Sequence, residues 1–460
     1  MRSALSRVSG SGVTILTGQR VVRYVRIVER PPTWRVQPYT IAYVLVDREL
    51  TPEELIGTHE WACREGLPNP RVITPSVLRW SELFNPRFFK ATMADPAFPA
   101  AADVSRLTWS NPALGHLDLT RFWLESVLFL AGVTLSAAIV QSRYSAGTIG
   151  SKFDRLWEAG VLAESGVVSD LQPLALKDAV RTLAATRGPG DVERLLAIRR
   201  LFMASLARIA PDDGEVVAMA AGSLPSTMAD RFGFVEMLRT ACGPRLRALI
   251  VYGSSVASES FADYDLLLIV DDVEDVLRAF AGRSPSWRGR ELNLGVYSPD
   301  EMLVMQRLSG DNIGEYGLCL WGQAAVVRKP ARMLLARNFS FGVVRQRQQL
   351  GMLSRAIADP PPGDGDDRRN LYEYFVKIPA NVAKGTFGVL GSRLSKEEIQ
   401  MWLQTCVGFD VAAQQSRSRA GHHVPALANA AIATGVVLER LNTRVEMCGP
   451  RLDQTAVRDR

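Results

Sequence analysis

Two short apolar runs, 248–252 and 265–270, constrain the fold more than any other feature of this 460-residue chain. Runs of this length, bounded by turn residues, predict strands of a sheet. A helix predicted at 273–281 and a strand predicted at 291–297 follow them along the chain. We therefore expect an α/β arrangement over about residues 225–345.

Polar residues suited to binding charged ligands lie at the neighbouring ends of the first two runs. Gly253 and Ser254 follow the first run, where glycine lets the backbone turn sharply and a serine hydroxyl and the next N–H groups can hold phosphate oxygens. Asp263 and Asp265 lie at the start of the second run. Because side chains alternate along a strand, both carboxylates project from one face, roughly 7 Å apart along the backbone. Such a pair suits two divalent cations that share ligands.

The order of these parts, from strand to Gly-Ser turn to an Asp-x-Asp that begins a second strand, resembles the nucleotidyltransferase superfamily of polymerase-beta-like and minimal nucleotidyltransferases. The resemblance covers roughly residues 225–330, about a quarter of the chain. It implies Mg²⁺-dependent transfer of a nucleoside monophosphate from a nucleoside triphosphate to a hydroxyl group. It also implies triphosphate binding by Gly253, Ser254 and Ser255, and binding of two Mg²⁺ ions by Asp263 and Asp265.

The resemblance implies a third carboxylate on the next strand, where the sequence offers both Glu291 and Asn293. These two alternate onto the same side of the strand. Asn293 occupies the position where the family has its acid, whereas the longer Glu291 would have to reach from one pleat away. We expect a triad of Asp263, Asp265 and Glu291, with Asn293 as the alternative occupant. The spacer before Asp263 is also shorter than in many relatives and has no arginine.

The remaining chain divides by composition into segments of different pattern. We expect a small α+β domain at 1–115, a helical domain at 116–215, the nucleotidyltransferase domain at 216–345 and a helical domain at 346–460. In the first of these, the motif Thr-Pro-Glu-Glu predicts a capped helix over about 51–65. The fold class is thus an α+β multidomain protein with a central nucleotidyltransferase-like mixed sheet and flanking helical domains.

Residues 134–165 resemble a winged helix-turn-helix, which would favour DNA as a partner. Its expected recognition helix carries Lys152 and Arg155 as its cations. The alternative is a helical connector that buries Leu156 and Trp157 in its own core.

Two further pairs of residues are functional candidates. Arg417 and His422 have a spacing similar to the ribonuclease motif of HEPN domains, although their surroundings favour a loop between helices. Arg328 and Lys329 could meet phosphate or form a solvated surface.

Composition limits the possible partners and location. The net charge of +6 and the pI near 9.1 favour an anionic partner such as nucleotide or nucleic acid. Five scattered cysteines without a C-x-x-C pair favour a reducing cytoplasm.

The apolar stretch 122–140 contains polar residues and predicts a buried helix, not a membrane span. His59 and His116 stand alone and predict no site.

These observations predict a soluble, Mg²⁺-dependent nucleotidyltransferase that acts on an unidentified acceptor, with nucleic acid favoured by the charge. The alternative is a catalytically weak transferase-like regulator or DNA-binding protein, indicated by Asn293 and by the missing arginine.

Overall fold

The computed structural model divides into two compact units. We call Leu124–Leu334 the central unit, and Met1–Trp123 together with Leu335–Arg460 the terminal unit. The structure describes residues 22–29, 40–79, 119–141, 190–210, 214–222, 226–257, 259, 261–359, 367–389 and 394–448.

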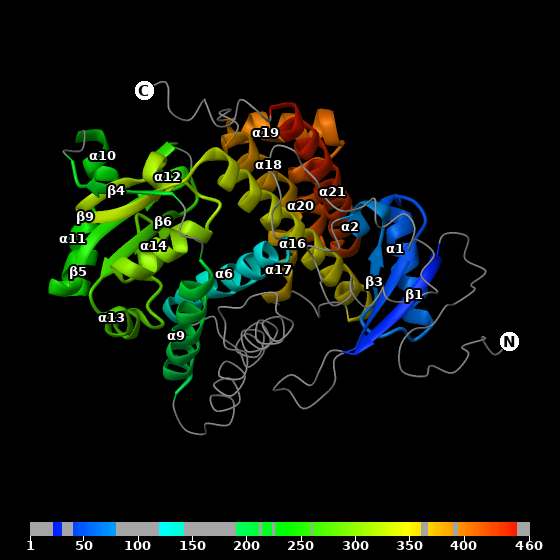
Figure 1. Ribbon diagram of the computed structural model, residues 1–460, viewed down its shortest axis with the longest axis horizontal. Helices are drawn as coiled ribbons and strands as arrows, with labels where there is room; N and C mark the ends of the chain where they lie inside the picture. The colour runs from blue at the N-terminus through cyan, green and yellow to red at the C-terminus, as the bar shows by residue number, and fades with distance from the viewer. Residues whose placement is uncertain are drawn as a thin grey trace. The chain divides into compact units, whose positions relative to one another are not determined.

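The terminal unit begins with a three-stranded sheet in the order β1-β2-β3 (Figure 1). Strands β1 (Val22–Glu29) and β2 (Thr40–Val46) are antiparallel, and β3 (Arg71–Ile73) pairs in parallel with β2. Helix α1 (Pro52–Arg64) connects β2 to β3, and the short α2 (Pro75–Arg79) follows. This is the α+β arrangement that the alternating and β-branched patterns predict.

Helix α1 begins where the sequence predicts. The Thr51 hydroxyl accepts a hydrogen bond from the backbone N–H of Glu54, and the Glu54 carboxylate accepts one from the N–H of Thr51. Pro52 lies in the first turn of the helix, where a backbone N–H has no partner within the helix, so the N–H that proline lacks is not needed there. Arg48 also donates to the Glu54 carboxylate and lowers the pKa of that group to about 2. The local sequence therefore determines this helix start.

The C-terminal helices share one hydrophobic core with the N-terminal sheet. Val44 of β2, Phe339 of α16 and Leu438 of α21 all belong to it, and α1 packs against α21. The expected separate domains at 1–115 and 346–460 thus form a single unit, because each buries its apolar face against the other. The helices are α16 (Ala331–Ala358), α17 (Asp367–Val376), α18 (Ile378–Val389), α19 (Lys396–Trp402), the π-helical η2 (Leu403–Val407), α20 (Val411–Arg419) and α21 (His423–Cys448).

One helix among the described residues, α21, is long and apolar enough to cross a membrane, over His423–Leu441. Of that stretch, 61% is buried inside the structure, as in the core helix of a water-soluble protein. The other apolar helix, α6 (Leu119–Val140), buries Leu128, Leu135 and Ile139 completely. It is a packed helix, as its periodicity predicts.

His59 gives the terminal unit a dependence on pH. Its ring is fully buried in α1, Nδ1 donates to the carbonyl of Leu55 at 2.9 Å, and Nε2 has no partner within the described part of the chain. Burial, with a smaller contribution from the charge of Arg71, lowers the pKa of His59 from 6.5 to about 4. Below pH 6.5 the unfolded chain therefore binds more protons than the folded one. We expect the terminal unit to lose about 3 kcal/mol of unfolding free energy between pH 7 and pH 4.

The measurement is the pH dependence of amide hydrogen exchange in peptides from α1. The matched variant is His59→Leu, which removes the titrating ring together with its hydrogen bond to the Leu55 carbonyl and should flatten the profile between pH 7 and pH 4. Parallel profiles for the variant and the wild type would contradict the assignment.

The central unit contains a six-stranded mixed sheet in the order β4-β9-β5-β6-β8-β7. Strand β5 is antiparallel to both β6 and β9, β6 is parallel to β8, and β4 and β7 pair antiparallel at the two edges. The strands are β4 (Glu215–Ala220), β5 (Leu246–Tyr252), β6 (Tyr264–Val270), β7 (Ser286–Trp287), β8 (Arg290–Tyr297) and β9 (Leu318–Arg328). The three strands predicted from the sequence, β5, β6 and β8, are adjacent in this sheet.

Helices lie beside this sheet in Figure 1, and α14, α15, α11 and α13 contact its strands. Helix α14 begins with a capping box between Ser298 and Glu301, and α13 with the Asp272 side chain. The remaining bounds in this unit are α9 (Asp191–Ile209), α10 (Ser226–Arg231), α11 (Val235–Cys242), the 3₁₀ helix η1 (Gly243–Arg245), α12 (Ser254–Ala257), α13 (Val273–Phe280), α14 (Pro299–Leu308) and α15 (Ile313–Tyr316).

The two faces of β6 have different neighbours. Tyr264 is buried and packs edge-on against Phe232 and Phe234, and its hydroxyl donates to the carbonyl of Arg231. The residues on either side of Tyr264 alternate to the opposite face. The aromatic cluster therefore orients the aspartates that flank Tyr264 away from this core.

Candidate functional site

The site starts at the backbone bend that ends β5. Gly253 has φ +78°, in the left-handed region that favours glycine, and α12 begins at the next residue. In the β5–β6 ladder, Tyr252 pairs directly with Asp265. A Cβ added at Gly253 would lie 2.6 Å from Oδ2 of Asp265. The bend thus brings the backbone into close contact with the Asp265 carboxylate.

Asp263 lies beside Asn293 of the neighbouring strand. Nδ2 of Asn293 donates to Oδ2 of Asp263 at 2.7 Å, and Asn293 is the register partner of Asp265 in the parallel β6–β8 pair. Directly paired residues share one face of a sheet. The structure therefore places both aspartates and Asn293 on one face, next to the Gly253 bend.

Glu291, the expected third carboxylate, is bound elsewhere. Its Oε1 accepts a 2.5 Å hydrogen bond from Nε2 of Gln141, directly after the end of α6. Among the described residues, no group of three or more Asp, Glu, His or Cys side chains has the arrangement of a metal site. The structure thus brings Asn293, and not Glu291, to the aspartates, because the pairing of β6 with β8 places Asn293 opposite Asp265.

The two serines of the turn differ in what their hydroxyls can reach. Ser255 is fully buried, its hydroxyl donates to the carbonyl of Tyr252 at 3.3 Å, and its own carbonyl accepts from Nη1 of Arg231 at 3.1 Å. The Ser255 hydroxyl is thus directed at the end of β5, and phosphate binding by Ser255 stays a prediction that concerns its backbone N–H. Ser254 is half-buried at the first position of α12.

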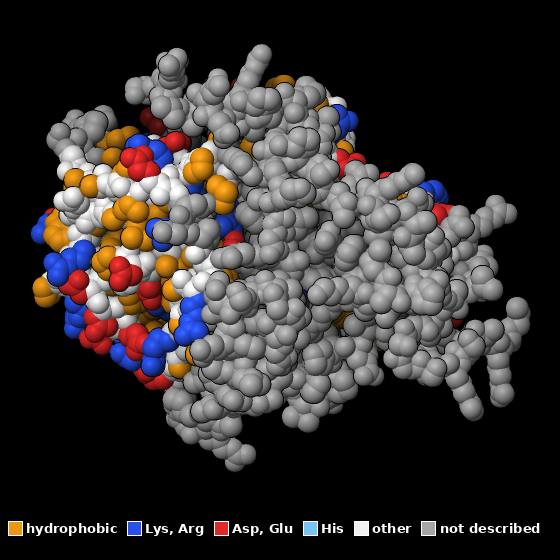
Figure 2. Space-filling view, in the orientation of Figure 1, with side chains coloured by type: hydrophobic (Ala, Val, Ile, Leu, Met, Phe, Trp, Pro, Cys, Tyr) orange, Lys and Arg blue, Asp and Glu red, His pale blue; other side chains and the backbone are white. Residues whose placement is uncertain are grey.

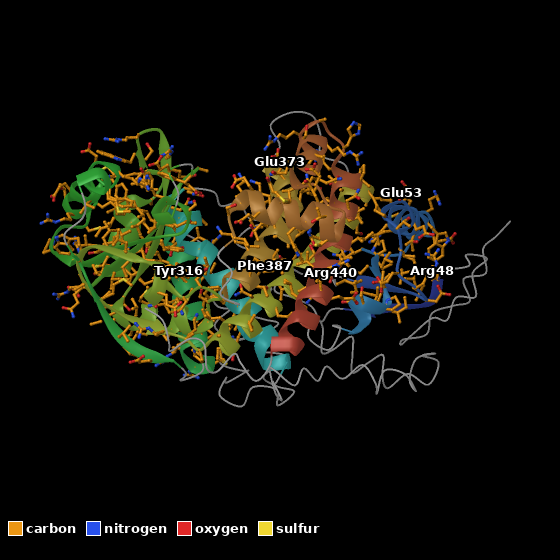
Figure 3. The ribbon with its side chains drawn as sticks, turned by 90° about the horizontal axis from the view of Figure 1, so that it is seen from above. Arg48, Glu53, Tyr316, Glu373, Phe387 and Arg440 are labelled. Atoms are coloured by element: carbon orange, nitrogen blue, oxygen red, sulfur yellow. The ribbon has the colours of Figure 1, made fainter. Side chains whose placement is uncertain are left out.

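Tyr252, Tyr316 and Asp311 also lie near this site, although the sequence pattern did not identify them as site residues. Burial raises the pKa of Tyr252, and the charges of Asp265 and Asp311 raise it further. The Tyr316 hydroxyl donates to Oδ1 of Asp311 at 3.0 Å, and Tyr316 is labelled in the central unit in Figure 3. Tyr252 could have been noted as the neighbour of Gly253, whereas Asp311 and Tyr316 lie in the loop and short helix after α14.

Arginines stack beside the turn although the segment between Ser254 and Asp263 contains none. The guanidinium carbons of Arg231 and Arg290 lie 5.6 Å and 3.9 Å from the ring centroid of Phe261. Arg231 also holds the Ser255 carbonyl. These cations come from α10 and β8, so the local sequence of the turn could not reveal them.

The other sequence candidates have structural roles or belong to the terminal unit. Lys329 is buried, and its Nζ donates to the carbonyls of Gln306 and Ser309 at the end of α14. Arg417 and His422 are exposed at the α20–α21 connection in the terminal unit. Most of the expected winged helix-turn-helix, and His116, lie outside the described residues.

One face of the central unit carries mixed charge. Figure 2 shows Lys and Arg interspersed with Asp and Glu on its visible face. Exposed ion pairs of this unit include Arg245 with Asp275 at 3.2 Å and Arg247 with Asp271 at 2.8 Å. Such exposed pairs contribute little to stability.

Comparisons of the chain with known protein families, with curated proteins and with solved structures found no match.

Proposed function

We propose that the central unit is a Mg²⁺-dependent nucleotidyltransferase. The observation that carries this proposal is the contact between the Asp265 carboxylate and the Gly253 bend, with Asp263 on the same face. A glycine turn that leads into a helix suits phosphate oxygens, and paired carboxylates suit a hard divalent cation. The mixed sheet, with β5 antiparallel to β6 and β6 parallel to β8, agrees with the resemblance seen in the sequence.

The roles of the residues follow from their chemistry. Ser254 and the backbone N–H groups after Gly253 would bind the triphosphate, and Asp263 and Asp265 would hold Mg²⁺. When bound, Mg²⁺ neutralises phosphate charge. The neutral phenol of Tyr252, whose pKa burial raises, adds no negative charge against the nucleotide. The net charge of +6 favours nucleic acid as the acceptor, and the free cysteines agree with a cytoplasmic location.

The test is transfer of label from each of the four α-³²P-labelled nucleoside triphosphates, with Mg²⁺ and the full chain, to total RNA. We expect label to become covalently attached to RNA with at least one nucleotide. Absence of label on RNA, on protein and on small-molecule hydroxyl acceptors would overturn the proposal.

One observation favours a second function, that of a nucleotide-binding regulator. Asn293 occupies the position of the third carboxylate and already bonds to Asp263. An amide cannot act as a base and binds a cation less well than a carboxylate does. Saturable binding of a fluorescent triphosphate without any transfer would support this candidate. A salt-sensitive shift of a DNA duplex by the full chain would add DNA binding to it.

The contact at Gly253 gives a sharp test of the site geometry. Gly253→Ala is expected to displace the Asp265 carboxylate, because the new Cβ would lie 2.6 Å from its Oδ2. We expect Mg²⁺-dependent nucleotide binding to weaken at least about 10-fold, and left-handed strain to lower the unfolding free energy by about 1 kcal/mol. Calorimetric titration and urea denaturation measure the two effects.

The matched control is Gly289→Ala in the β7–β8 turn. Gly289 has a similar φ of +74°, but nothing lies within 4 Å of its added Cβ. The control should show the same loss of stability and unchanged nucleotide binding. Equal binding by both variants would show that the Gly253 contact does not matter for the ligand.

A further inference from the structure

We propose that Asp311 is the general base of the transfer reaction, the group that takes the proton from the acceptor hydroxyl. The inference rests on the proposed nucleotidyltransferase function and adds a catalytic residue to its site. Three features of the structure carry it. They are the state of the two candidates on β8, the path of the chain after β8, and the way in which the Asp311 carboxylate is held.

The first feature is that β8 offers no base beside the two aspartates. Asn293 occupies the position where the resemblance implies the third acid, and an amide has no site that accepts a proton at neutral pH. Its Nδ2 instead donates to Oδ2 of Asp263 at 2.7 Å. Glu291 accepts a 2.5 Å hydrogen bond from Gln141. A base for the acceptor hydroxyl must therefore come from another element.

The second feature is the path of the chain after β8, which begins on the face that carries Asn293. Tyr297, at the end of β8, alternates onto the same face as Asn293. Arg199 lies 5.9 Å from the centroid of the Tyr297 ring and bonds to Glu301 of α14. Helix α14 also contacts β6 and β8. The helix therefore lies on the face of the sheet where the aspartates are.

After α14 the chain returns to the end of the sheet that carries the aspartates. Strand β9 begins at Leu318, which pairs with Val251 near the end of β5. Tyr252, the last residue of β5, pairs with Asp265 on its other side. The segment between α14 and β9, residues 309–317, thus leads into the sheet at the end where Asp265 lies.

The third feature is the way in which this segment holds the Asp311 carboxylate. One oxygen accepts a hydrogen bond from the Tyr316 hydroxyl at 3.0 Å, and the other accepts one from the Ser309 hydroxyl at 3.3 Å. A carboxylate has about four lone-pair sites, so acceptor capacity remains for a further donor. Asp311 is exposed. Burial raises the pKa of Tyr252, and the charges of Asp265 and Asp311 raise it further, because both acids lie near this phenol.

In the proposed step, the acceptor hydroxyl gives its proton to the Asp311 carboxylate while its oxygen bonds to the α-phosphorus of the nucleoside triphosphate. The bond from that phosphorus to the bridging oxygen of the leaving group breaks, and pyrophosphate leaves. Asp311 then loses the proton to water. A positioned base of this kind contributes typically about 10²- to 10⁴-fold to the rate.

The experiment measures single-turnover transfer of α-³²P label to total RNA by the full chain with Mg²⁺. Calorimetric titration of the α,β-methylene analogue of the transferred nucleotide measures binding. We expect Asp311→Asn to lower the transfer rate about 100-fold or more and to change the dissociation constant by less than about 3-fold. Asp311→Glu should recover part of the rate, because it keeps a carboxylate.

Chemical rescue separates a base from a residue that only supports the fold. Formate should raise the rate of Asp311→Ala at least about 10-fold, because it supplies a carboxylate in place of the missing side chain. The matched control is Glu315→Gln, which removes the same charge from an exposed side chain of α15. We expect the control to transfer label at the wild-type rate and to be unaffected by formate.

The outcomes separate this inference from the proposed function. A wild-type rate in Asp311→Asn would overturn the inference and leave the nucleotidyltransferase in place. Failure of both formate and Asp311→Glu to recover any rate would overturn the role of Asp311 as the base. Absence of transfer by the wild type would overturn the proposed function, and the inference with it. If Asp311→Asn fails to fold, Asp311→Ala with and without formate still decides the role.

Discussion

Asp265→Asn is expected to lower the rate of nucleotidyl transfer at least about 10³-fold, equivalent to about 4 kcal/mol of activation free energy. The substitution keeps the shape of the side chain against Gly253 and removes its charge. A neutral amide binds a hard cation weakly, so the loss should appear in the chemical step and in the Mg²⁺ concentration needed for half-maximal rate. Single-turnover transfer of label measures both.

The matched control is Asp271→Asn, directly after the other end of β6. Asp271 is exposed and paired with Arg247 on the surface, so its loss should change stability by less than about 1 kcal/mol and leave transfer unchanged. If Asp265→Asn transferred label at the wild-type rate, the protein would still be a transferase, but Asp265 would not belong to its active site.

Arg199→Met is expected to lower the unfolding free energy of the central unit by about 3 kcal/mol. The Arg199 side chain on α9 is only 4% exposed and forms two hydrogen bonds to the Glu301 carboxylate, at 2.8 and 2.7 Å. It also donates to the carbonyl of Val296 at 2.9 Å. In the variant the Glu301 carboxylate, which is only 22% exposed, loses its cationic partner. Hydrogen exchange in peptides of β6 and β8 reports the change under mild urea.

The neighbouring Arg200 provides the control for this prediction. Arg200 is 64% exposed and pairs with Glu274 at 2.6 Å, so Arg200→Met should change stability by no more than about 1 kcal/mol. Adding Glu301→Gln to Arg199→Met should recover part of the loss, since the unpaired charge is then removed. Equal effects of the two arginine variants would show that burial of the pair does not govern its contribution.

Several features could be predicted from the sequence because neighbouring residues create them. The capping box at Thr51 joins residues three apart, and the structure contains it. The two apolar runs predicted β5 and β6, and the pattern at 291–297 predicted β8, since strand burial depends on the residues of each segment. Period-two alternation also placed Asp263 and Asp265 on one face. These features need no knowledge of distant partners.

The domain division required the tertiary structure. The N-terminal sheet and the C-terminal helices have separate patterns along the chain, and only packing showed that they share one core. No local signal links segments hundreds of residues apart, because each shows an apolar face without showing what covers it. Arg231 was missed for a similar reason, because it reaches the turn from α10, 24 positions earlier in the chain.

The sequence by itself determined the strands, the glycine bend and the two aspartates, because these depend on backbone preferences and on alternation within a few residues. Only the tertiary structure decided that Asn293 meets Asp263, and that Glu291 meets Gln141, 150 positions away. Both side chains alternate onto the same side of β8, so the pattern could not choose between them. The register of β8 on β6 and the position of the end of α6 determine which of the two side chains lies beside the aspartates.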